Sequence, residues 1–171
     1  RFGTYSSSLA ATASTQMGTP PLRPTTTCTG RVLSGTSPYR AVNDAASVTE
    51  MAEVAARVRE LTERVFGQGM EVSQFTHLVS SINDRIAQRL LTLLTGELAA
   101  DARFCWLAFG SEGREEQGFV TDQDNGIVFV PPAGSDLETV RAGYLAMARQ
   151  MNEALHACGF ERCRGNIMAG N

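Results

Sequence analysis

The pattern of apolar residues changes its period after residue 96, and that change most restricts the possible folds. Between residues 47 and 96 apolar side chains recur at helical spacing, whereas two short, continuous apolar runs follow at 104–109 and 126–130. Helical spacing predicts amphipathic helices, and short apolar runs bounded by turn residues are typical of buried strands. We therefore expect an α/β (α+β) fold, with a small mixed sheet flanked by helices and preceded by an α-helical hairpin.

Capping signals predict where the helices begin and end. A capping box, Ser47-Val48-Thr49-Glu50, opens a first helix over 47–67, and a second helix is expected over 73–95. Their short connection makes them an antiparallel pair. A second capping box, Ser135-Asp136-Leu137-Glu138, opens a helix that runs to Gly159, and a third strand should follow it.

Composition divides the chain into three parts. Residues 1–46 are rich in Ser, Thr, Ala, Gly and Pro, with no acidic residue before Asp44, and predict a flexible arm or linker. An organelle transit peptide is a weaker alternative. Residues 47–98 form the hairpin and 99–171 the α/β core. Because the chain starts with Arg1 and stops at Asn171, just after a possible strand, we expect a core truncated at its C-terminus.

The charged residues exclude several classes of function. All fifteen basic residues among the 171 are Arg, so a P-loop lysine and Schiff-base chemistry are excluded. The net charge of −3 argues against general nucleic-acid binding, and no apolar run approaches the ~18 residues of a membrane span. With only His77 and His156, a histidine-rich metal site is also excluded.

The four cysteines predict a reducing, cytoplasmic location. They are too few and too scattered for the disulfide framework of a small secreted domain. A zinc site at His156, Cys158 and Cys163 lacks a fourth ligand, so free buried thiols are the favoured interpretation for the cysteines: Cys28, Cys105, Cys158 and Cys163.

Glycines, hydroxyls and carboxylates concentrate together only in residues 110–124. Asp122 and Asp124 are two apart at the entrance of the second expected strand, so both carboxylates should point to one face. Two such carboxylates repel each other unless a cation lies between them, and hard oxygen ligands suit Mg²⁺ or Mn²⁺. This pair is therefore a candidate metal site.

The first expected strand ends at residues that suit a phosphate. Gly110 allows close backbone approach, Ser111 offers a hydroxyl and an amide, and Arg114 could add a planar cation. Each feature has an ordinary alternative: a turn for Gly-Ser, a solvated strand end for Asp-x-Asp, and a surface ion pair for Arg114 with its Glu neighbours. Their combination on adjacent strand ends favours a nucleoside triphosphate with its metal.

Other conspicuous residues have ordinary interpretations. For Asn83-Asp84, in the second helix, a solvated helix face is favoured over a role at the edge of a cleft. His77 predicts a surface or packing contact. Trp106, Met147 and Met151 are expected in the core.

The central segment resembles a known superfamily. Gly110-Ser111 followed by Asp122-x-Asp124 resembles the nucleotidyltransferases of the DNA polymerase beta superfamily, and with Gly113-Arg114-x-Glu116 and Thr121 it is similar to the protein-PII uridylyltransferases. Three segments also resemble the nucleotidyltransferase domain that bacteria place after cyclic-nucleotide-binding and CBS domains, a likeness that covers about residues 50 to 171: Ser81–Asp84, Phe104–Asn125 and Cys163–Ala169.

The resemblance implies a nucleotidyltransferase-like fold and a role for each residue of the motif. Asp122 and Asp124 would be catalytic and would coordinate Mg²⁺ or Mn²⁺. Nucleotide-binding roles fall to Gly110, Ser111, Gly113, Arg114 and Thr121. The superfamily commonly uses a third carboxylate on a later strand, and after Phe160 this chain offers only Glu161, so the third acid either lies beyond Asn171 or is missing.

We therefore expect a metal-dependent nucleotidyltransferase that moves a nucleoside monophosphate from a nucleoside triphosphate to an unknown, possibly protein, acceptor, with release of pyrophosphate. The resemblance also implies sensory domains upstream in the full-length protein. One alternative is a non-catalytic, nucleotide-sensing regulatory module attached to signalling domains. Another is an interaction scaffold whose helical hairpin docks a partner.

Overall fold

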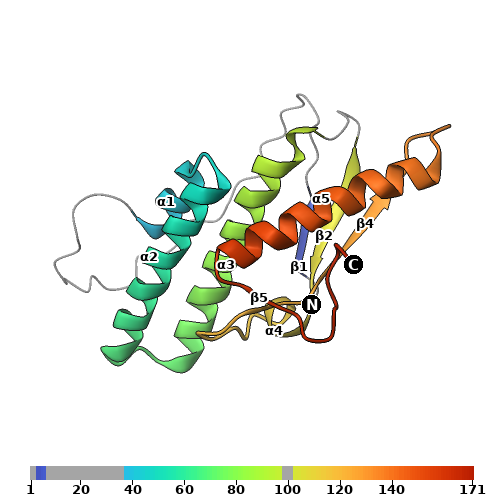
Figure 1. The fold of residues 1–171 in the computed structure, drawn as a ribbon. Coiled ribbons are helices and arrows are strands. Elements are labelled where there is room, and N and C mark those ends of the chain that lie inside the picture. The colour runs from blue at the N-terminus through green and yellow to red at the C-terminus, as the bar shows by residue number, and fades with distance from the viewer. Residues whose placement is uncertain (1–2, 7–36, 98–101) are drawn as a thin grey trace, which may run out of the picture.

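The computed structural model describes residues 3–6, 37–97 and 102–171, and it has the α/β architecture expected from the sequence (Figure 1). In the described residues, three long helices (α2, α3 and α5), two short ones (α1 and α4) and a 3₁₀ turn (η1) accompany two small sheets. The elements follow in this order: β1 (Gly3–Ser6), α1 (Pro38–Asp44), α2 (Val48–Gly67), α3 (Val72–Leu94), η1 (Thr95–Glu97), β2 (Arg103–Ala108), α4 (Gly110–Gly113), β3 (Asp122–Gln123), β4 (Asn125–Val130), α5 (Leu137–Ala157) and β5 (Glu161–Arg162).

Helices α2 and α3 form the predicted antiparallel hairpin (Figure 1). The capping box at its start is present, since Ser47 Oγ accepts from the Glu50 amide at 3.1 Å. The Glu50 carboxylate accepts in turn from the Ala46 amide at 2.8 Å, one residue before the N-cap. Together these bonds satisfy two of the backbone amides that a helix start leaves without intrahelical acceptors.

The strands pair in both directions, as a mixed sheet requires. In the larger sheet β2 lies between β1 and β4 and is antiparallel to both, with Trp106 opposite Ile127. The third strand expected after Gly159 is β5, a two-residue strand parallel to β3, with Asp122 opposite Glu161. The pairing of β3 with β5 brings the end of the chain beside the Asp-x-Asp segment.

Helix α5 covers one face of the larger sheet (Figure 1). Tyr144 stacks on Phe129 with ring centroids 4.6 Å apart and tilts against Phe104 at 5.7 Å. Trp106, Met147 and Met151 are buried in this core, as predicted.

The expectation that both apolar runs are fully buried strands is wrong for β4. Val128 is 58% exposed and Val130 is 52% exposed. Strand β4 presents only its alternate residues, Ile127 and Phe129, to the core. A continuous apolar run cannot distinguish a strand covered on two faces from one covered on a single face.

The predicted arm, residues 1–46, is described only at 3–6 and 37–46, and there it is not a plain linker. Strand β1 pairs with β2, and α1 packs on the hairpin with Val42 fully buried. Ala45 is buried too, and its carbonyl accepts from Arg89 Nε of α3 at 2.8 Å. A seven-residue helix in which only Val42 is buried is too short to give a periodic signal in the sequence.

No helix in the described ranges is both long and apolar enough to cross a membrane. Cys28 lies outside the described residues.

Candidate functional site

The turn between β2 and α4 lies directly against Asp124. The Phe109 amide donates to the Asp124 carbonyl at 2.8 Å, which joins the end of β2 to the bend before β4. Gly110 has a φ of +57°, and a Cβ added there would lie 2.3 Å from Asp124 Oδ2. Only glycine fits this approach without displacing the carboxylate. Gly110 therefore lies directly against one member of the acidic pair, Asp124.

Asp122 and Asp124 share one side of the chain because the residue between them points inward. Asp122 is exposed and Asp124 half-buried, whereas Gln123 is 1% exposed. This alternation is the period-two pattern that the sequence predicted. The two aspartates do not begin one strand, however: Asp122 belongs to β3, and Asp124 lies at the bend between β3 and β4.

The carboxylate of Asp124 is not fully satisfied by the described residues. Its Oδ1 is buried and accepts no hydrogen bond from any of them. A buried carboxylate oxygen without a partner is costly, and a cation is the group that would satisfy it. The donor set therefore fits a divalent metal with oxygen ligands.

No group of three or more His, Cys, Asp or Glu side chains in the described ranges has an arrangement that could hold a metal ion. Asp122 and Asp124 alone would make an open site rather than a cage. Mg²⁺ is commonly bound in this way, by one or two carboxylates with the remaining positions left to water and phosphate.

Sequence reasoning missed two further acids near the pair, because it treated Glu112 as a surface partner of Arg114 and Asp84 as solvated. Burial is the main reason why the pKa of Glu112 is raised from 4.5 to about 8. Repulsion from three nearby carboxylates adds to the shift: those of Asp84, Asp122 and Asp124. These four acids come from α3, α4, β3 and the β3–β4 bend, which no sequence spacing relates.

The other residues of the Gly-Ser motif lie on or beside α4. Ser111 is half-buried, and its carbonyl accepts from the Glu116 amide at 2.9 Å. The Gly113 amide donates to Phe109 O at 3.0 Å. Arg114 forms an exposed ion pair with Glu116, Nε to Oε2 at 2.7 Å, which is the ordinary alternative considered for it. Contacts of these residues with a nucleotide stay predictions.

The solvated helix face favoured for Asn83-Asp84 is wrong for Asn83. Asn83 is 9% exposed, and its Nδ2 donates to Gln117 Oε1 and, at 3.4 Å, to Thr121 Oγ1. Thr121 is buried as well, and its carbonyl accepts from the Glu161 amide at 2.7 Å. Thr121 thus anchors residues 114–121, which we call the site loop, to α3 and β5. The signal that could have revealed Asn83 is a polar residue within an apolar helical stripe.

The histidines and the described cysteines give no metal centre. Cys105, Cys158 and Cys163 are free thiols, as favoured. His156 Nδ1 faces the Phe160 carbonyl at 3.3 Å. His77 lies on the surface, 3.2 Å from Glu115, and so makes the expected surface contact.

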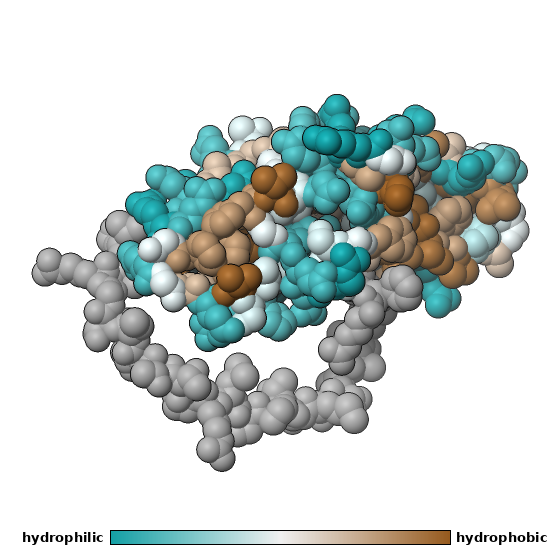
Figure 2. Space-filling model, turned by 90° about the horizontal axis from the view of Figure 1, so that it is seen from below, coloured by the Kyte–Doolittle hydropathy of each residue, from teal (hydrophilic) through white to brown (hydrophobic). Residues whose placement is uncertain are grey.

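Figure 2 shows apolar surface in two separate areas of one face, over the hairpin tip with the site loop and over the β4 end, with hydrophilic surface between them. Val72 at the start of α3 and Phe119 and Val120 of the site loop are exposed, as are Val128 and Val130 of β4. Phe119 also contacts the rings of Phe66 and Phe75, at 5.3 and 4.5 Å. These contacts hold the site loop on the hairpin.

This geometry agrees with the comparison with known protein families. Residues 56–171, more than half of the chain, match the family described as "Putative nucleotidyltransferase DUF294". The chain belongs to that family, and the family supports a general role in nucleotidyl transfer. No curated protein and no solved structure is significantly similar to the chain.

Proposed function

We propose that this domain transfers a nucleoside monophosphate from a nucleoside triphosphate to an acceptor and releases pyrophosphate. The observation that carries the proposal is the close approach of the Gly110-Ser111 turn to Asp124, whose Oδ1 is buried and unpartnered. A triphosphate seated on the turn would lie beside carboxylates that suit its metal. The family of the chain supports the same reaction class.

Asp122 and Asp124 would hold Mg²⁺ or Mn²⁺, with the remaining coordination positions left to water and to phosphate oxygens. When bound, the metal would neutralise charge on the triphosphate and polarise the acceptor. The raised pKa of Glu112 is consistent with this proposal, because the carboxylates of Asp84, Asp122 and Asp124 add to the main effect of burial in favouring the protonated form of that carboxyl.

The chain's own residues would position and orient the substrates. An acceptor oxygen attacks the α-phosphorus, and the bond from that phosphorus to the oxygen bridging to the β-phosphorus breaks. The electron pair leaves with pyrophosphate, and the acceptor's proton passes to water or to a site carboxylate. Ser111 would donate to the triphosphate, and Arg114 would exchange its ion pair with Glu116 for a phosphate oxygen.

The proposal extends to the acceptor and to the neighbouring domains. The similarity of the motif to protein-PII uridylyltransferases supports a protein acceptor. The likeness to domains that follow CBS and cyclic-nucleotide-binding domains supports sensory regions upstream. A cytoplasmic location agrees with both.

Calorimetric titration of each nucleoside triphosphate with Mg²⁺ tests the site. We expect metal-dependent binding to the natural chain and none to an Asp122→Asn, Asp124→Asn variant that keeps its circular dichroism. A Glu53→Gln, Glu63→Gln variant is the control, since it removes the same charge from exposed positions of α2. A pyrophosphate-release assay with candidate protein acceptors then tests the chemistry.

Each result separates the proposals. Binding lost only in the aspartate variant, together with pyrophosphate release, supports the transferase. Tight binding without release under any acceptor would support the nucleotide-sensing module. Equal binding by the aspartate variant and the natural chain would contradict a site at these residues.

A further inference from the structure

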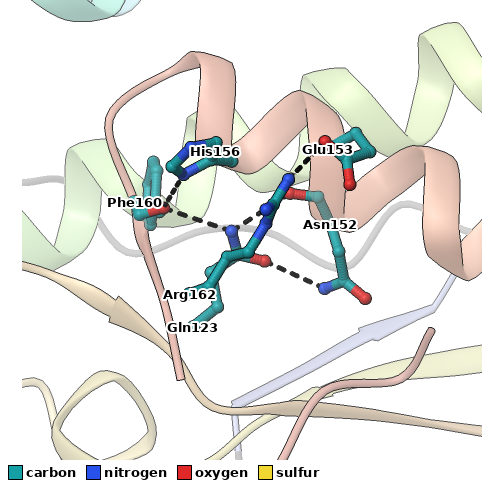
Figure 3. A network of polar contacts seen from close by, with 6 residues as sticks. All are labelled: Gln123, Asn152, Glu153, His156, Phe160 and Arg162. Atoms are coloured by element: carbon teal, nitrogen blue, oxygen red, sulfur yellow. Dashed lines mark hydrogen bonds and ion pairs between the residues drawn. The ribbon is translucent and has the colours of Figure 1, made fainter. Parts of the chain in front are cut away.

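Asn152 is a buried polar residue in the stripe of α5 that faces the core. It is 6% exposed, and its helical neighbours Ala148, Met151 and Leu155 are also buried. A carboxamide in such a place is costly unless its hydrogen bonds are made. Its Oδ1 and Nδ2 both have partners, and its two side-chain partners, Gln123 and Asn125, flank Asp124 in the sequence. Figure 3 shows the contact with Gln123.

The orientation of the Asn152 amide follows from a backbone donor. The Gly170 amide donates to Asn152 Oδ1 at 2.9 Å, and a backbone N–H can only donate. The Nδ2 group must therefore face the other partners. It donates to Gln123 Oε1 at 2.9 Å and to Asn125 Oδ1 at 3.0 Å.

Gln123 is fixed from its other end as well. Its Nε2 donates to the Asn152 carbonyl at 3.0 Å and to the Phe160 carbonyl at 3.2 Å. Both ends of the Gln123 amide are therefore bound to the helix α5 region (Figure 3). Since successive side chains of an extended segment alternate, a Gln123 that points toward α5 directs Asp122 and Asp124 to the opposite side of the chain.

Asn125 completes the arrangement on the far side of Asp124. Its Oδ1 also accepts from the Ala169 amide at 2.9 Å, and its own amide donates to Ile167 O at 3.0 Å. The segment 167–170 is thus bound to the residue that follows Asp124. Asn152 reaches this segment too, through Gly170.

We propose that Asn152 is a positioning residue of the candidate site, one that sets the direction of the Asp122 and Asp124 carboxylates by holding residues 123 and 125. Its side chain hydrogen-bonds to residues 123, 125 and 170, so it acts on the aspartates through its two amide partners. The inference rests on the proposed function, because it concerns how well those carboxylates bind a metal. Groups that orient metal ligands in this way typically change metal affinity about 10–100-fold when they are mutated.

The variant Asn152→Asp tests the proposal most directly. It keeps the acceptor for Gly170 but places a carboxylate oxygen against the two acceptor oxygens of Gln123 and Asn125. Asn152→Ser, which is small and still polar, is the second variant in case the aspartate does not fold. Leu155→Ala is the matched control, since Leu155 is buried on the same helix and its side chain cannot hydrogen-bond to residues 123 or 125.

Two measurements on the full chain decide the matter. Mn²⁺ affinity should fall about 10-fold or more in the Asn152 variants and stay unchanged in Leu155→Ala. Without metal, the Phe109 amide, which donates to Asp124 O, should exchange its hydrogen faster in the Asn152 variants than in a control of equal stability.

The outcomes for the two proposals differ. Folded Asn152 variants with natural Mn²⁺ affinity or natural Phe109 exchange would overturn the positioning role. A natural chain that binds no Mn²⁺ would instead contradict the proposed function, while faster exchange at Phe109 would still support a hold on the Asp124 segment by Asn152.

Discussion

At the scale of single residues, the approach of two backbone segments sets the geometry of the candidate site. The Phe109 amide and Gly110 both lie against Asp124, and the positive φ of Gly110 turns the chain into α4. The hydrogen bond is made by backbone atoms alone, and Asp124 occupies the space that a side chain at position 110 would need. The site therefore relies on the absence of a side chain there.

Gly110→Ala should remove metal and nucleotide binding and lower the free energy of unfolding by about 1–3 kcal/mol, because the new methyl group occupies the position of Asp124 Oδ2 and the left-handed backbone is strained. Gly118→Ala is the control, since nothing lies within 4 Å of a Cβ at that position of the site loop. Calorimetry and thermal unfolding measure the two effects. Natural binding by Gly110→Ala would show that Asp124 can move without consequence.

Glu112→Gln should stabilise the metal-free chain, and increasingly so as the pH rises from about 4.5 to about 8. The pKa of Glu112 is raised in the fold, so the unfolded chain ionises first, and the fold loses stability across that window. Above the window the penalty is constant, and we expect it to be on the order of 1–2 kcal/mol after allowance for solvent screening.

Thermal unfolding in a chelator, measured at several pH values, checks this expectation. Glu63→Gln, an exposed change on α2, should follow the natural chain throughout. Parallel curves for Glu112→Gln and the natural chain would contradict the raised pKa of Glu112 and therefore its burial beside the other acids.

At the scale of elements, the start of α5 shows how a capping signal can be displaced by one residue. The sequence places Ser135 at the head of a capping box, but the N-cap in the structure is Asp136, whose Oδ2 accepts from the Thr139 amide at 2.9 Å and from its hydroxyl at 2.6 Å. Ser135 Oγ instead donates to the Pro132 carbonyl. Both residues are good N-caps, so composition alone could not choose between them.

Asp136→Ala should therefore lower the unfolding temperature at neutral pH, whereas Ser135→Ala should change it little. Hydrogen bonds from Thr139 hold the pKa of Asp136 below its usual range, so the stabilisation is present above the unfolded pKa and is lost as the pH falls through the folded pKa. Thermal scans from neutral to acidic pH should show the difference between Asp136→Ala and the natural chain shrink. A larger loss for Ser135→Ala would place the cap at the other residue.

At the scale of the whole molecule, the long helices and the two apolar strands could be predicted because each repeats its pattern over many residues. The helix predicted at 73–95 is found at Val72–Leu94, for example. The pairing of β3 with β5 could not be predicted, since two-residue strands have no period to detect. Helix α1 is also too short to show a period, so the sequence placed its residues in the predicted arm.

Part of the candidate site could also be predicted from the sequence, and part could not. Local spacing was enough to place Asp122, Gln123 and Asp124 on alternating sides. The convergence of Glu112 with Asp84, and the bonds of Asn152 to residues 123 and 125, depend on how distant elements pack. Asn83 and Asn152 could have been noticed as polar residues within apolar helical stripes. Such a position indicates that the side chain is buried, but it does not identify its hydrogen-bond partner.

The lack of space at Gly110 also offers a way to classify related sequences. Any related sequence with a side chain at the equivalent of position 110 must move its aspartate or lose it, since a Cβ there would come within 2.3 Å of Asp124 Oδ2. Changes at the two positions should therefore occur together across evolution. A single aligned column would then separate relatives that retained the chemistry from those that kept only the scaffold.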